Sequence, residues 1–547
     1  MEDQALFEQH HKTGQTFSYG TAGFRSKSDG LDPVMFAVGV VAGIRSMFLE
    51  GSVVGVMITA SHNPPEDNGV KIVDPRGEMM EQSWEKLATQ VANSACESYE
   101  AFCHAVSVVC MSVGVKRSAM KGRIVVARDS RASGPRLLQA FLAGVKWVGN
   151  VEAYDYGTLT TPQLHFLASQ SNIGKLEDKT SAAPLPRVHE TAYYDTFLSA
   201  WTSIAQIAGF DSLPYPVTID AANGIGAAKV REMLLNHPFF QKDVSLVNAD
   251  WHAAALLNHQ CGADFVKTNQ RLPQGVEGSR AGINCSFDGD ADRVVFYFCD
   301  SEAKFHLLDG DKLATLLARF FKTLLEDAGV QEQVSLGVVQ TAYANGSSTA
   351  YIERILQVPV SCTPTGVKHL HHEAVTRFDI GIYFEANGHG TVVFSPQALQ
   401  KLQDKLETVE VGPHAHRALQ LILLFSKLIN QTVGDAITDM LAILAVLSIL
   451  KWSPETWDSE YTDLPNKLVK VVVPDRTIFK TTNAERQLTS PPGLQAKIDA
   501  AIARVLRGRS FVRASGTEDA VRVYAEAATE TEAHLLAKEV DELVRTY

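Results

Sequence analysis

Six times along this chain of 547 residues, a short apolar run is followed by a loop rich in glycine and polar residues and then by a helical pattern. These segments lie at 53–64, 122–135, 217–228, 281–293, 335–348 and 379–390. Strands that alternate with helices predict βαβ units on a largely parallel sheet, which is an α/β fold. Ligands of such sheets bind at the carboxyl ends of the strands, so the polar residues after these runs are the first candidates for a functional site.

Length and composition indicate a globular protein of several domains. A chain of 547 residues is expected to hold three to five domains, and 45% hydrophobic and 20% charged residues are ordinary values for such a protein. The polar, aperiodic stretch 171–186 and a break near 451–454 are candidate boundaries. The last hundred residues alternate strand-like and helical segments in an order that predicts a small α+β module with an antiparallel sheet.

Several classes of protein are disfavoured. The net charge of −12 argues against general binding to nucleic acid or to an anionic membrane. The longest apolar runs, 421–425 and 440–450, are shorter than the roughly 20 residues of a membrane span, so 440–450 is expected to be a buried helix. The N-terminus lacks the features of a signal peptide, and the seven cysteines include no CxxC pair. We therefore expect a cytoplasmic protein without a disulfide framework, with Cys96, Cys103 and Cys110 on one face of a helix.

The segment TASHNP, residues 59–64, follows an apolar run that is typical of a buried strand. Ser61 is therefore expected to lie exposed at the end of a strand, where it is a candidate nucleophile. The simpler interpretation is a serine that caps a helix or a turn. His62 is not expected to be its triad partner, because adjacent side chains on extended backbone point in opposite directions. No GxSxG motif surrounds Ser61, so a serine that carries a phosphoryl group remains open.

The segment SFDGDADR, residues 286–293, places Asp288, Asp290 and Asp292 within five residues. Carboxylates so close together repel one another, and a divalent cation is the usual remedy. The alternative of an EF-hand fails, because Arg293 stands where that loop needs glycine and Cys299 where it needs glutamate. Residues two apart in an extended loop share a face, so the three carboxylates can converge on one ion. Oxygen ligands favour Mg²⁺, and the remaining negative charge invites a further ligand or a phosphate.

Two further segments have the chemistry of a sugar phosphate site. In EANGHG, residues 385–390, Glu385 and Asn387 can accept from and donate to vicinal hydroxyls, and His389 can move protons. The alternative here is a β-turn with a capping asparagine. In RASGTEDAVR, residues 513–522, arginines, hydroxyls and a glycine form an anion cradle. Its alternative is a solvated loop with surface ion pairs. The histidines of TPTGVKHLHH, residues 363–372, lack the spacing of a helical zinc pair.

Taken together, these segments resemble the α-D-phosphohexomutase superfamily over nearly the whole chain. YGTAGFR (19–25), VMITASHNPPEDNGVKIVDP (56–75), QTAYANGSS (340–348) and RASGTEDAVRVYAEA (513–527) belong to the resemblance. The early serine loop, TAYANGSS and EANGHG favour its acetylglucosamine branch over phosphoglucomutase or phosphomannomutase. One departure is visible, since Ala514 stands where proline is usual. Loss of the fixed φ of proline predicts altered substrate affinity at most.

The resemblance implies four domains around a central cleft, three of them related mixed-sheet α/β domains and the last a C-terminal α+β domain. It implies a phosphoserine domain at 1–186, a metal-binding domain at 187–305, a sugar-binding domain at 306–452 and a phosphate-binding domain at 453–547.

The resemblance also implies the roles of the candidate site residues. Ser61 corresponds to a phosphoserine that binds Mg²⁺ through its phosphate, beside Asp288, Asp290 and Asp292. The sugar ligands correspond to Glu385, Ala386 and Asn387, and basic positions near the transferred group to Lys71, His389, Arg25 and Arg293. The pocket for the phosphate that is not transferred corresponds to Arg513, Ala514, Ser515, Gly516, Thr517 and Arg522.

The implied activity is interconversion of N-acetylglucosamine 6-phosphate and 1-phosphate through a phosphoserine and a sugar 1,6-bisphosphate, on the route to UDP-N-acetylglucosamine. The implied partner is a small hexosamine phosphate, with no nucleic acid and no membrane, and no oligomeric state is indicated. Three alternatives stay open at this point: a phosphoglucomutase or phosphomannomutase, a silent sugar-phosphate-binding regulator, and a metallophosphatase. Retention of Ser61, the three aspartates and Arg513 disfavours the silent regulator.

Overall fold

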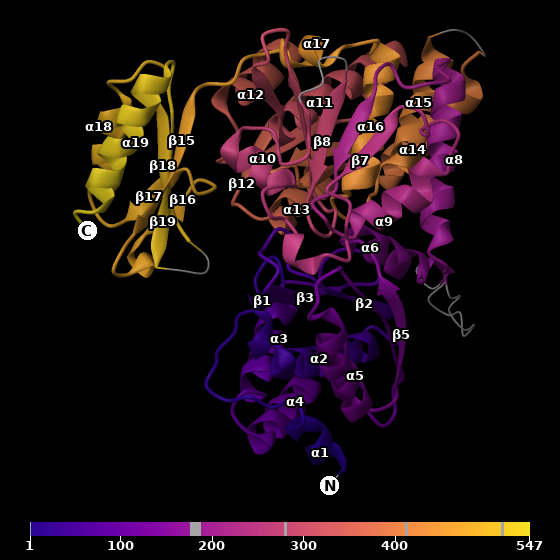
Figure 1. Cartoon of the computed structure of the whole chain (residues 1–547), viewed down its shortest axis with the longest axis vertical. Coiled ribbons are helices and arrows are strands. Elements are labelled where there is room, and N and C mark those ends of the chain that lie inside the picture. The colour runs from indigo at the N-terminus through magenta and orange to yellow at the C-terminus, as the bar shows by residue number, and fades with distance from the viewer. Residues whose placement is uncertain (1, 175–187, 278–281, 411–413, 516–518) are drawn as a thin grey trace. The chain divides into compact units, whose positions relative to one another are not determined.

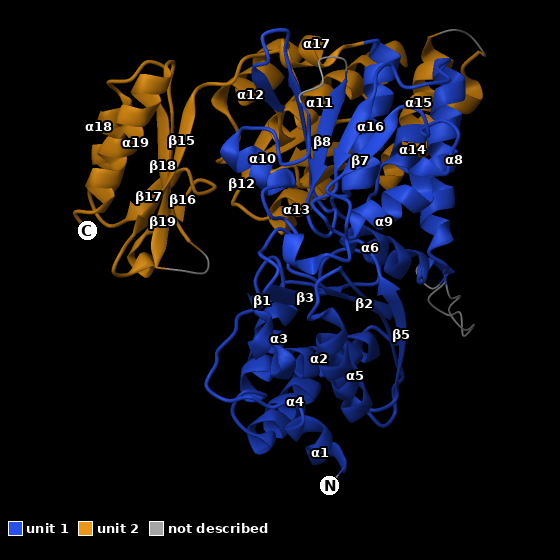
Figure 2. Ribbon diagram, in the orientation of Figure 1, with its two compact units in different colours: residues 1–307, 424–451 blue, residues 308–423, 452–547 orange. Residues whose placement is uncertain are grey.

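The computed structural model describes residues 2–174, 188–277, 282–410, 414–515 and 519–547. Its internal contacts divide the chain into two units (Figure 2). Unit 1 contains residues 1–307 and 424–451, and unit 2 contains residues 308–423 and 452–547. Each unit is described by itself. Most of the stretch 171–186, which the sequence marks as a linker or insertion, lies outside the described residues.

The first part of unit 1 is a five-stranded sheet with helices on both sides of it. Its strands are β1 (Phe24–Lys27), β2 (Val53–Ile58), β3 (Asp67–Val73), β4 (Gly122–Arg128) and β5 (Val151–Thr158), and its helices are α1 (Glu2–Glu8), α2 (Asp32–Phe48), α3 (Ser83–Ser94), α4 (Tyr99–Val113), α5 (Gly134–Val148) and α6 (Thr161–Gln170). The strand order is β1-β3-β2-β4-β5 (Figure 1). Strands β2, β4 and β5 are parallel, whereas β3 is antiparallel to β2 and to β1.

The second part of unit 1 is another five-stranded sheet. Its strands are β6 (Val217–Asp220), β7 (Val244–Val247), β8 (Ile283–Phe287), β9 (Val294–Cys299) and β10 (Phe305–Leu308), and its helices are α8 (Thr191–Ala208), α9 (Gly226–Val230), α10 (Ala263–Asn269) and α16 (Ala436–Leu450). The order is β10-β9-β8-β6-β7, with β6, β7 and β8 parallel and β9 antiparallel to β8. Helix α16 packs against α8 and β9 and is buried from Ala436 to Leu447, which confirms the buried helix expected there.

Unit 2 begins with a four-stranded sheet. Its strands are β11 (Leu336–Thr341), β12 (Val360–Thr363), β13 (Ile380–Phe384) and β14 (Gly390–Phe394), and its helices are α11 (Gly310–Asp327), α12 (Gly346–Ala350), α13 (Val367–Arg377), α14 (Pro396–Thr408) and α17 (Pro454–Asp458). Helix α15 (Ala415–Leu428) begins in this unit, and its residues from Leu424 onward are assigned to unit 1. The order is β12-β11-β13-β14, in which only β14 is antiparallel to its neighbour.

The C-terminal part of unit 2 is an antiparallel sheet with two helices. Its elements are β15 (Asn466–Val472), β16 (Lys480–Thr482), β17 (Gln487–Ser490), α18 (Leu494–Ile502), β18 (Arg509–Ala514), β19 (Ala520–Glu526) and α19 (Glu530–Val544). The strand order is β15-β19-β18, and β16 and β17 form a separate hairpin. Figure 1 shows α18 and α19 on one side of the sheet, where their apolar faces close a core around Leu494, Ile498 and Val540. The predicted α+β module is confirmed.

The three α/β sheets share one plan. In each, a parallel strand continues through a short loop into an antiparallel strand beside it: β2 into β3, β8 into β9 and β13 into β14. The centre of each sheet is parallel, as expected, and the added antiparallel strand makes each sheet mixed, which confirms the mixed-sheet α/β domains that the resemblance implies. The three loops of these hairpins contain TASHNP, DGDADR and EANGHG. As predicted, these three motifs follow the carboxyl ends of parallel strands, whereas the phosphate motif at 513–522 begins at the end of the antiparallel strand β18.

Only two of the three cysteines at seven-residue spacing lie on one helix. Cys103 and Cys110 lie on α4, but Cys96 lies in the turn after α3, so the expected cysteine face holds for two of the three. The polypeptide turns between the helices at 95–98, which breaks the seven-residue period. Over the described residues, no helix is both long and apolar enough to cross a membrane.

Helices α2 and α5 approach each other through glycines. A Cβ atom on Gly144 would lie 2.0 Å from the carbonyl oxygen of Phe36, and one on Gly39 would lie 2.3 Å from the carbonyl oxygen of Phe141. Real Cβ atoms do not come this close to backbone, so a larger residue would force the two helices apart.

We expect Gly144→Ala to lower the free energy of unfolding by about 1–3 kcal/mol, because overpacking outweighs the better helix propensity of alanine. Denaturant unfolding followed by circular dichroism measures this change. Gly174→Ala is the control, since a Cβ there meets no atom within 4 Å, and its effect should stay within about 0.5 kcal/mol. A Gly144→Ala protein as stable as the wild type would contradict the close helix contact.

Candidate active site

Ser61 lies in the loop between β2 and β3 and is fully buried. The expectation that it is exposed is wrong, because the loop between β8 and β9 covers it. The Ser61 hydroxyl donates a hydrogen bond of 2.6 Å to Asp288 Oδ2, and a Cβ on Gly289 would lie 2.7 Å from the carbonyl oxygen of Ser61. Ser61 also has a φ of 52°, a left-handed conformation that is uncommon for serine. Strain of this kind clusters at functional sites.

His62 does not activate Ser61, although the reason differs from the one expected. The backbone is not extended at Ser61, so the argument from opposite side-chain directions is wrong. The Ser61 hydroxyl is instead occupied by Asp288. The positive charge of Arg293, burial of the ring and the charge of Arg25 lower the pKa of His62 to about 2. His62 is therefore neutral near neutral pH.

The loop between β8 and β9 brings the three predicted aspartates together. Ligand oxygens of Asp288, Asp290 and Asp292 lie within 4.8 Å of one another, and all three residues are buried. Burial, followed by the charges of Asp292 and Asp290, holds the pKa of Asp288 well above its usual range. Such a group of carboxylates is costly without a cation to neutralise it.

The two oxygens of Asp290 differ in their partners. Its Oδ2 accepts hydrogen bonds from the hydroxyls of Thr161 at 2.5 Å and Thr59 at 3.1 Å. Its Oδ1 is buried and accepts no hydrogen bond from the part of the chain that the structure describes. A buried carboxylate oxygen without a partner costs free energy, and a metal ion would supply that partner. The donor set consists of oxygens only, which suits a hard divalent cation such as Mg²⁺.

Three cationic side chains surround the aspartates. Lys71 Nζ, on β3, lies 3.2 Å from Asp292 Oδ2 and 3.7 Å from Asp290 Oδ2. Arg293 Nε lies 3.7 Å from both Asp288 Oδ2 and Asp292 Oδ1. Arg25, on β1, donates to Asn63 Oδ1 at 3.3 Å, and burial, together with the charge of Arg293, lowers its pKa.

The charges of this cluster balance. Three aspartates and three cations sum to zero, so addition of a divalent metal ion and a dianionic phosphate together keeps the sum at zero. Arg25 Nε is buried and makes no hydrogen bond with any described residue, which leaves one donor for an anion. The cluster therefore suits a phosphoryl group bound beside a metal ion.

Arg131 holds in place the loop between β2 and β3 that carries Ser61, residues 59–67 with the first residue of β3 included, which we call the serine loop. Arg131 was not predicted from the sequence. Its side chain is fully buried, and Nε donates to Asp129 Oδ2 at 3.0 Å. The two terminal nitrogens donate to four carbonyl oxygens of the loop, those of Ser61 (2.9 Å), Asn63 (2.8 Å), Pro64 (2.6 Å) and Asp67 (2.9 Å). The only sequence signal was its place in the polar loop after β4.

Asn258 supports the serine loop from the second sheet of unit 1. Its Nδ2 donates to the carbonyl oxygens of Ser61 at 3.0 Å and Asn63 at 3.2 Å. No motif marks Asn258 in the sequence. The backbone of Ser61 is thus fixed from two sides while its hydroxyl faces the aspartates.

In unit 2, the loop between β13 and β14 forms a tight turn that carries the predicted sugar ligands. The Glu385 N–H donates to the His389 carbonyl at 2.8 Å, and Asn387 Nδ2 donates to Glu385 Oε2 at 3.4 Å. Glu385, Ala386 and Asn387 are half-buried, and His389 is buried. A Cβ on Gly310 would lie 1.9 Å from the Glu385 carbonyl oxygen, so the start of α11 presses against this loop.

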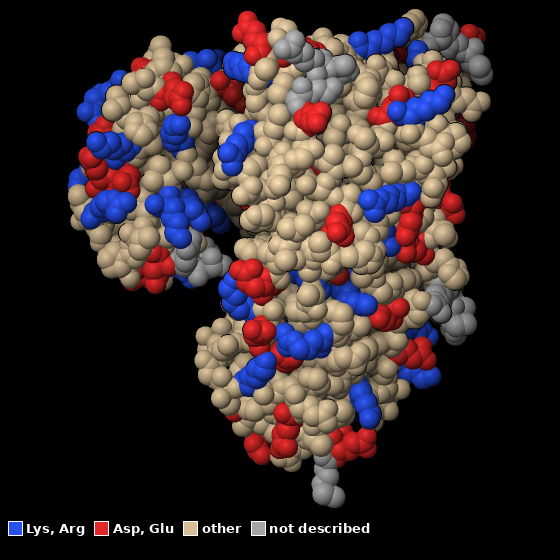
Figure 3. Space-filling view, in the orientation of Figure 1, with Lys and Arg blue, Asp and Glu red and all other residues tan. Residues whose placement is uncertain are grey.

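The predicted phosphate ligands lie where β18 ends and β19 begins. Arg513 and Arg522 are directly opposite each other in the antiparallel pair, Ala514 lies opposite Val521, and the Ser515 N–H donates to the Ala520 carbonyl at 2.8 Å. Like charges opposite each other destabilise a sheet, and an anion between them relieves the repulsion. Gly516 and Thr517 lie outside the described residues. On the face drawn in Figure 3, Lys and Arg side chains gather over the C-terminal strands and otherwise alternate with acidic ones.

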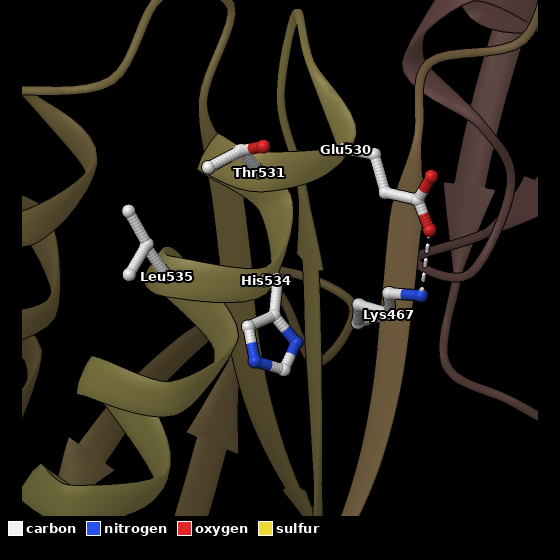
Figure 4. A pocket seen from close by; sticks show the side chains of 5 residues that line it. All are labelled: Lys467, Glu530, Thr531, His534 and Leu535. Carbon is white, nitrogen blue, oxygen red and sulfur yellow. Dashed lines mark hydrogen bonds and ion pairs between the residues drawn. The ribbon is translucent and has the colours of Figure 1, made fainter.

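A separate hollow lies on the C-terminal part of unit 2 (Figure 4). It is lined by Lys467, Glu530, Thr531, His534 and Leu535, and an ion pair of 3.2 Å joins Lys467 to Glu530. None of the predicted site residues lines this hollow, and we do not count it as part of the site.

Family comparisons cover most of the chain. The description "Phosphoacetylglucosamine mutase AMG1" matches with its domain II at residues 182–295 and its domain III at 309–452. The description "Phosphoglucomutase/phosphomannomutase" matches with its alpha/beta/alpha domain I at 40–98 and 100–175 and with its C-terminal domain at 468–543.

Similar proteins and structures agree with these matches. The phosphoacetylglucosamine mutase of Candida albicans is 50% identical to this chain, and the alignment covers 97% of each protein. The phosphoacetylglucosamine mutase of Saccharomyces cerevisiae is 51% identical, and the alignment covers 97% of this chain and 96% of that protein. A crystal structure of an N-acetylglucosamine-phosphate mutase in its product complex has a TM-score of 0.92 at 50% identity, with 99% of this chain and 98% of that chain covered.

The Aspergillus fumigatus N-acetylphosphoglucosamine mutase is a second structural relative. Its complex with GlcNAc-6P and magnesium has a TM-score of 0.92 at 46% identity, with 100% of this chain and 98% of that chain covered. A variant of that enzyme in complex with glucose 1,6-bisphosphate has a TM-score of 0.91 at 46% identity and the same coverage.

We expect Mg²⁺ to stabilise the folded protein, because the folded state holds the oxygens of the three aspartates within 4.8 Å of one another. At 100 times its dissociation constant the ion should add about 2.7 kcal/mol. Thermal unfolding in Mg²⁺ and in EDTA measures this effect. Asp290→Asn should abolish the difference, whereas Asp264→Asn, a half-exposed carboxylate 3.4 Å from Arg293, should keep it. An Asp290→Asn protein with the full wild-type shift would show that the ion binds elsewhere.

We expect Arg131→Ala to destabilise the protein by roughly 3–5 kcal/mol, since it removes the guanidinium charge that pairs with the buried Asp129 and one donor from each of four carbonyls. Urea unfolding measures the loss. The matched control is Arg123→Ala, because Arg123 is half-exposed and its nearest carboxylate oxygen, on Glu152, is 4.0 Å away. Its loss should be about 1 kcal/mol or less. Equal losses in the two variants would contradict the role given to Arg131.

Proposed function

The chain belongs to the phosphoacetylglucosamine mutases, and we propose that it interconverts N-acetyl-D-glucosamine 6-phosphate and N-acetyl-D-glucosamine 1-phosphate. The reaction moves a phosphoryl group between two oxygens of one sugar, so the enzyme is an isomerase. Its partner is a small hexosamine phosphate. We place the activity in the cytoplasm, on the route to UDP-N-acetylglucosamine.

One observation carries this proposal. The Ser61 hydroxyl lies 2.6 Å from Asp288 Oδ2, within a cluster of three aspartates and three cationic side chains. A hydrolase triad places a histidine beside the serine hydroxyl, whereas the hydroxyl of Ser61 donates to a carboxylate of the acidic cluster. The groups around Ser61 suit a metal ion and a phosphoryl group instead. We therefore take Ser61 to be a phosphoserine in the working enzyme.

The phosphoryl group stays on the enzyme between turnovers. The free hydroxyl of the bound sugar monophosphate attacks the phosphorus on Ser61, the bond from phosphorus to Ser61 Oγ breaks, and a sugar 1,6-bisphosphate forms. The bisphosphate reverses its orientation, and the Ser61 hydroxyl attacks its other phosphate. The sugar leaves with a phosphate on its other oxygen. Each attacking hydroxyl loses a proton and each leaving oxygen gains one, so no water is consumed.

The aspartates would hold the metal ion. Asp288, Asp290 and Asp292 each offer an oxygen, and an oxygen of the phosphoserine would complete the set. Bound there, Mg²⁺ neutralises charge on the group being transferred. The unpartnered Asp290 Oδ1 supports this assignment, as does the magnesium complex of the A. fumigatus relative. Added sugar 1,6-bisphosphate would act as an activator, because it can phosphorylate Ser61.

The basic residues have different tasks. Arg25 and Arg293 bind oxygens of the phosphoryl group on Ser61, since guanidinium groups match phosphate geometry. Lys71, with its single charge beside Asp292 and Asp290, stabilises the negative charge of the transfer site. His389 is our candidate for moving protons to and from sugar hydroxyls.

Unit 2 supplies substrate recognition in this proposal. Glu385, Ala386 and Asn387 bind sugar hydroxyls, which a carboxylate and an amide can pair in either orientation of the ring. The phosphate that is not being transferred binds a pocket made by Arg513, Ala514, Ser515, Gly516, Thr517 and Arg522. Because the bisphosphate presents each of its phosphates in turn, this pocket must accept both.

We also propose four functional domains. They are the phosphoserine domain at 1–186, the metal-binding domain at 187–305, the sugar-binding domain at 306–452 and the phosphate-binding domain at 453–547. Each of the first three contains one sheet with a motif-bearing hairpin, which supports this division.

The test is conversion of N-acetylglucosamine 6-phosphate by purified protein with Mg²⁺ and a trace of glucose 1,6-bisphosphate. We expect N-acetylglucosamine 1-phosphate as the product, and a loss of roughly 10⁴-fold or more in Ser61→Ala, which lacks the group that carries the phosphoryl. Ser203→Ala is the control, because that exposed hydroxyl donates to the carbonyl of Ser199 in its own helix at 2.9 Å.

Other results would identify other functions. Faster turnover of glucose 1-phosphate would indicate a phosphoglucomutase, and inorganic phosphate as the main product a phosphatase. If protein with confirmed phosphorylation at Ser61 converts none of the hexose phosphates, the proposed function is wrong.

A further inference from the structure

Glu485 joins two segments of unit 2 that lie far apart in the sequence. Its Oε1 accepts a hydrogen bond of 2.8 Å from Arg513 Nε. Its Oε2 accepts from the backbone N–H of Thr365 at 2.9 Å and from the Thr365 hydroxyl at 2.5 Å. Figure 1 shows the hairpin of β16 and β17, whose turn contains Glu485, projecting toward β12. One carboxylate thus connects the end of β18 with the loop after β12.

The turn that carries Glu485 is strained. Asn483, Ala484 and Glu485 have φ values of 52°, 52° and 66°, three consecutive left-handed residues without a glycine. Such a conformation is unfavourable for alanine and glutamate. Arg486 closes the turn by donating to the carbonyl of Asn483 at 3.0 Å and to its side-chain oxygen at 2.7 Å. The fold therefore keeps Glu485 in place at a cost in local energy.

The hydrogen bond from Arg513 Nε to Glu485 leaves the terminal amino groups of the guanidinium facing away from Glu485, where they can bind an anion. A guanidinium has five N–H donors, and its two amino groups bind carboxylate or phosphate oxygens side by side. Glu485 accepts from Nε, and Tyr343 also hydrogen-bonds the guanidinium, so between them they occupy part of its donor set. Burial disfavours the charge of Arg513, but Glu485 and Tyr343 outweigh burial and raise the pKa, so the guanidinium stays charged. The side chains of Arg513 and Glu485 are 25% and 16% exposed, so both are partly shielded from water.

We propose that Glu485 is a positioning residue for substrate phosphate. It holds the guanidinium of Arg513 by Nε so that the two amino groups face the phosphate, and it fixes the loop of Thr365 relative to that guanidinium. This inference rests on the proposed function and adds a residue to its phosphate pocket. Glu485 itself would not touch the substrate, because its carboxylate would repel a phosphate.

If Glu485 competed with the substrate phosphate for Arg513, removal of Glu485 would change the KM in the opposite direction. If Glu485 instead occupied the place of the phosphate, the substrate would have to displace it, and removal of Glu485 would lower the KM. In the positioning role, removal frees the side chain of Arg513 to rotate, and the KM rises. The direction of the change in KM therefore decides between the two.

The first experiment measures kcat and KM for N-acetylglucosamine 6-phosphate in Glu485→Ala and Glu485→Gln. We expect the KM to rise roughly 10-fold in Glu485→Ala, as for loss of a charged hydrogen bond, while kcat changes about 3-fold or less. Glu485→Gln keeps an acceptor for Arg513 but loses one for Thr365, so its rise should be smaller. Glu530→Ala, on the same domain and 78% exposed, is the control and should leave both constants unchanged.

The second experiment repeats Glu485→Ala in an Arg513→Lys background. A lysine has no Nε–H for Glu485 to hold, so the further rise in KM should fall to about 2-fold or less. A purely structural role of Glu485 would give the same ratio in both backgrounds and would overturn the inference. A fall or no change in KM of Glu485→Ala would also overturn it. If the wild type itself has no activity, it is the proposed function that fails. Should Glu485→Ala not fold, Glu485→Gln carries the same comparison.

Discussion

The hydrogen bond from the Ser61 hydroxyl to Asp288 is the contact that the rest of unit 1 supports. It joins the loop between β2 and β3 to the loop between β8 and β9, which belong to two different sheets. Arg131 donates hydrogen bonds to four carbonyl oxygens of the serine loop, and Asn258, from the segment between β7 and α10, donates to two of them. Thr161 donates to one oxygen of Asp290. Arg131 and Thr161 are buried and Asn258 is partly buried, so a broken contact leaves a polar atom without a partner where little water reaches it. This is how a left-handed serine is kept in one conformation.

The hairpin loop at the equivalent position of the three α/β sheets carries different functional residues in each sheet. The hairpins that add β3, β9 and β14 to their sheets carry the serine, the aspartates and the Glu385 loop, respectively. In the third sheet the hairpin comes last in the sequence, in the second it is followed only by β10, and in the first it precedes β4 and β5. Each hairpin follows a buried parallel strand, so its loop is anchored at both ends by strands inside a core. The fold thus offers rigid, equivalent loops, and the residues within them decide the function.

Local patterns in the sequence predict what depends on neighbouring residues. The strand before Ser61, the spacing of the three aspartates, the buried helix α16 and the C-terminal α+β module all follow from short runs, and the structure agrees. The exposure of Ser61 was wrong because it depends on a loop more than 200 residues later in the chain. Arg131, Asn258 and Glu485 gave no usable signal for the same reason. Their partners are chosen by the fold, and a single arginine, asparagine or glutamate in a loop is normally solvated.

Charge balance explains why so many ionised groups can be buried around one serine. Three aspartates and three cations cancel, which limits the desolvation cost that a single unpaired charge would impose. Taking up a phosphoryl group alone, or a metal ion alone, would leave two uncancelled charges in this shielded place. Taking up both restores neutrality. By linkage, each must therefore strengthen the binding of the other by the same factor. A phosphorylated Ser61 and a bound divalent ion then form one state of the site, and loss of either weakens the hold on its counterpart.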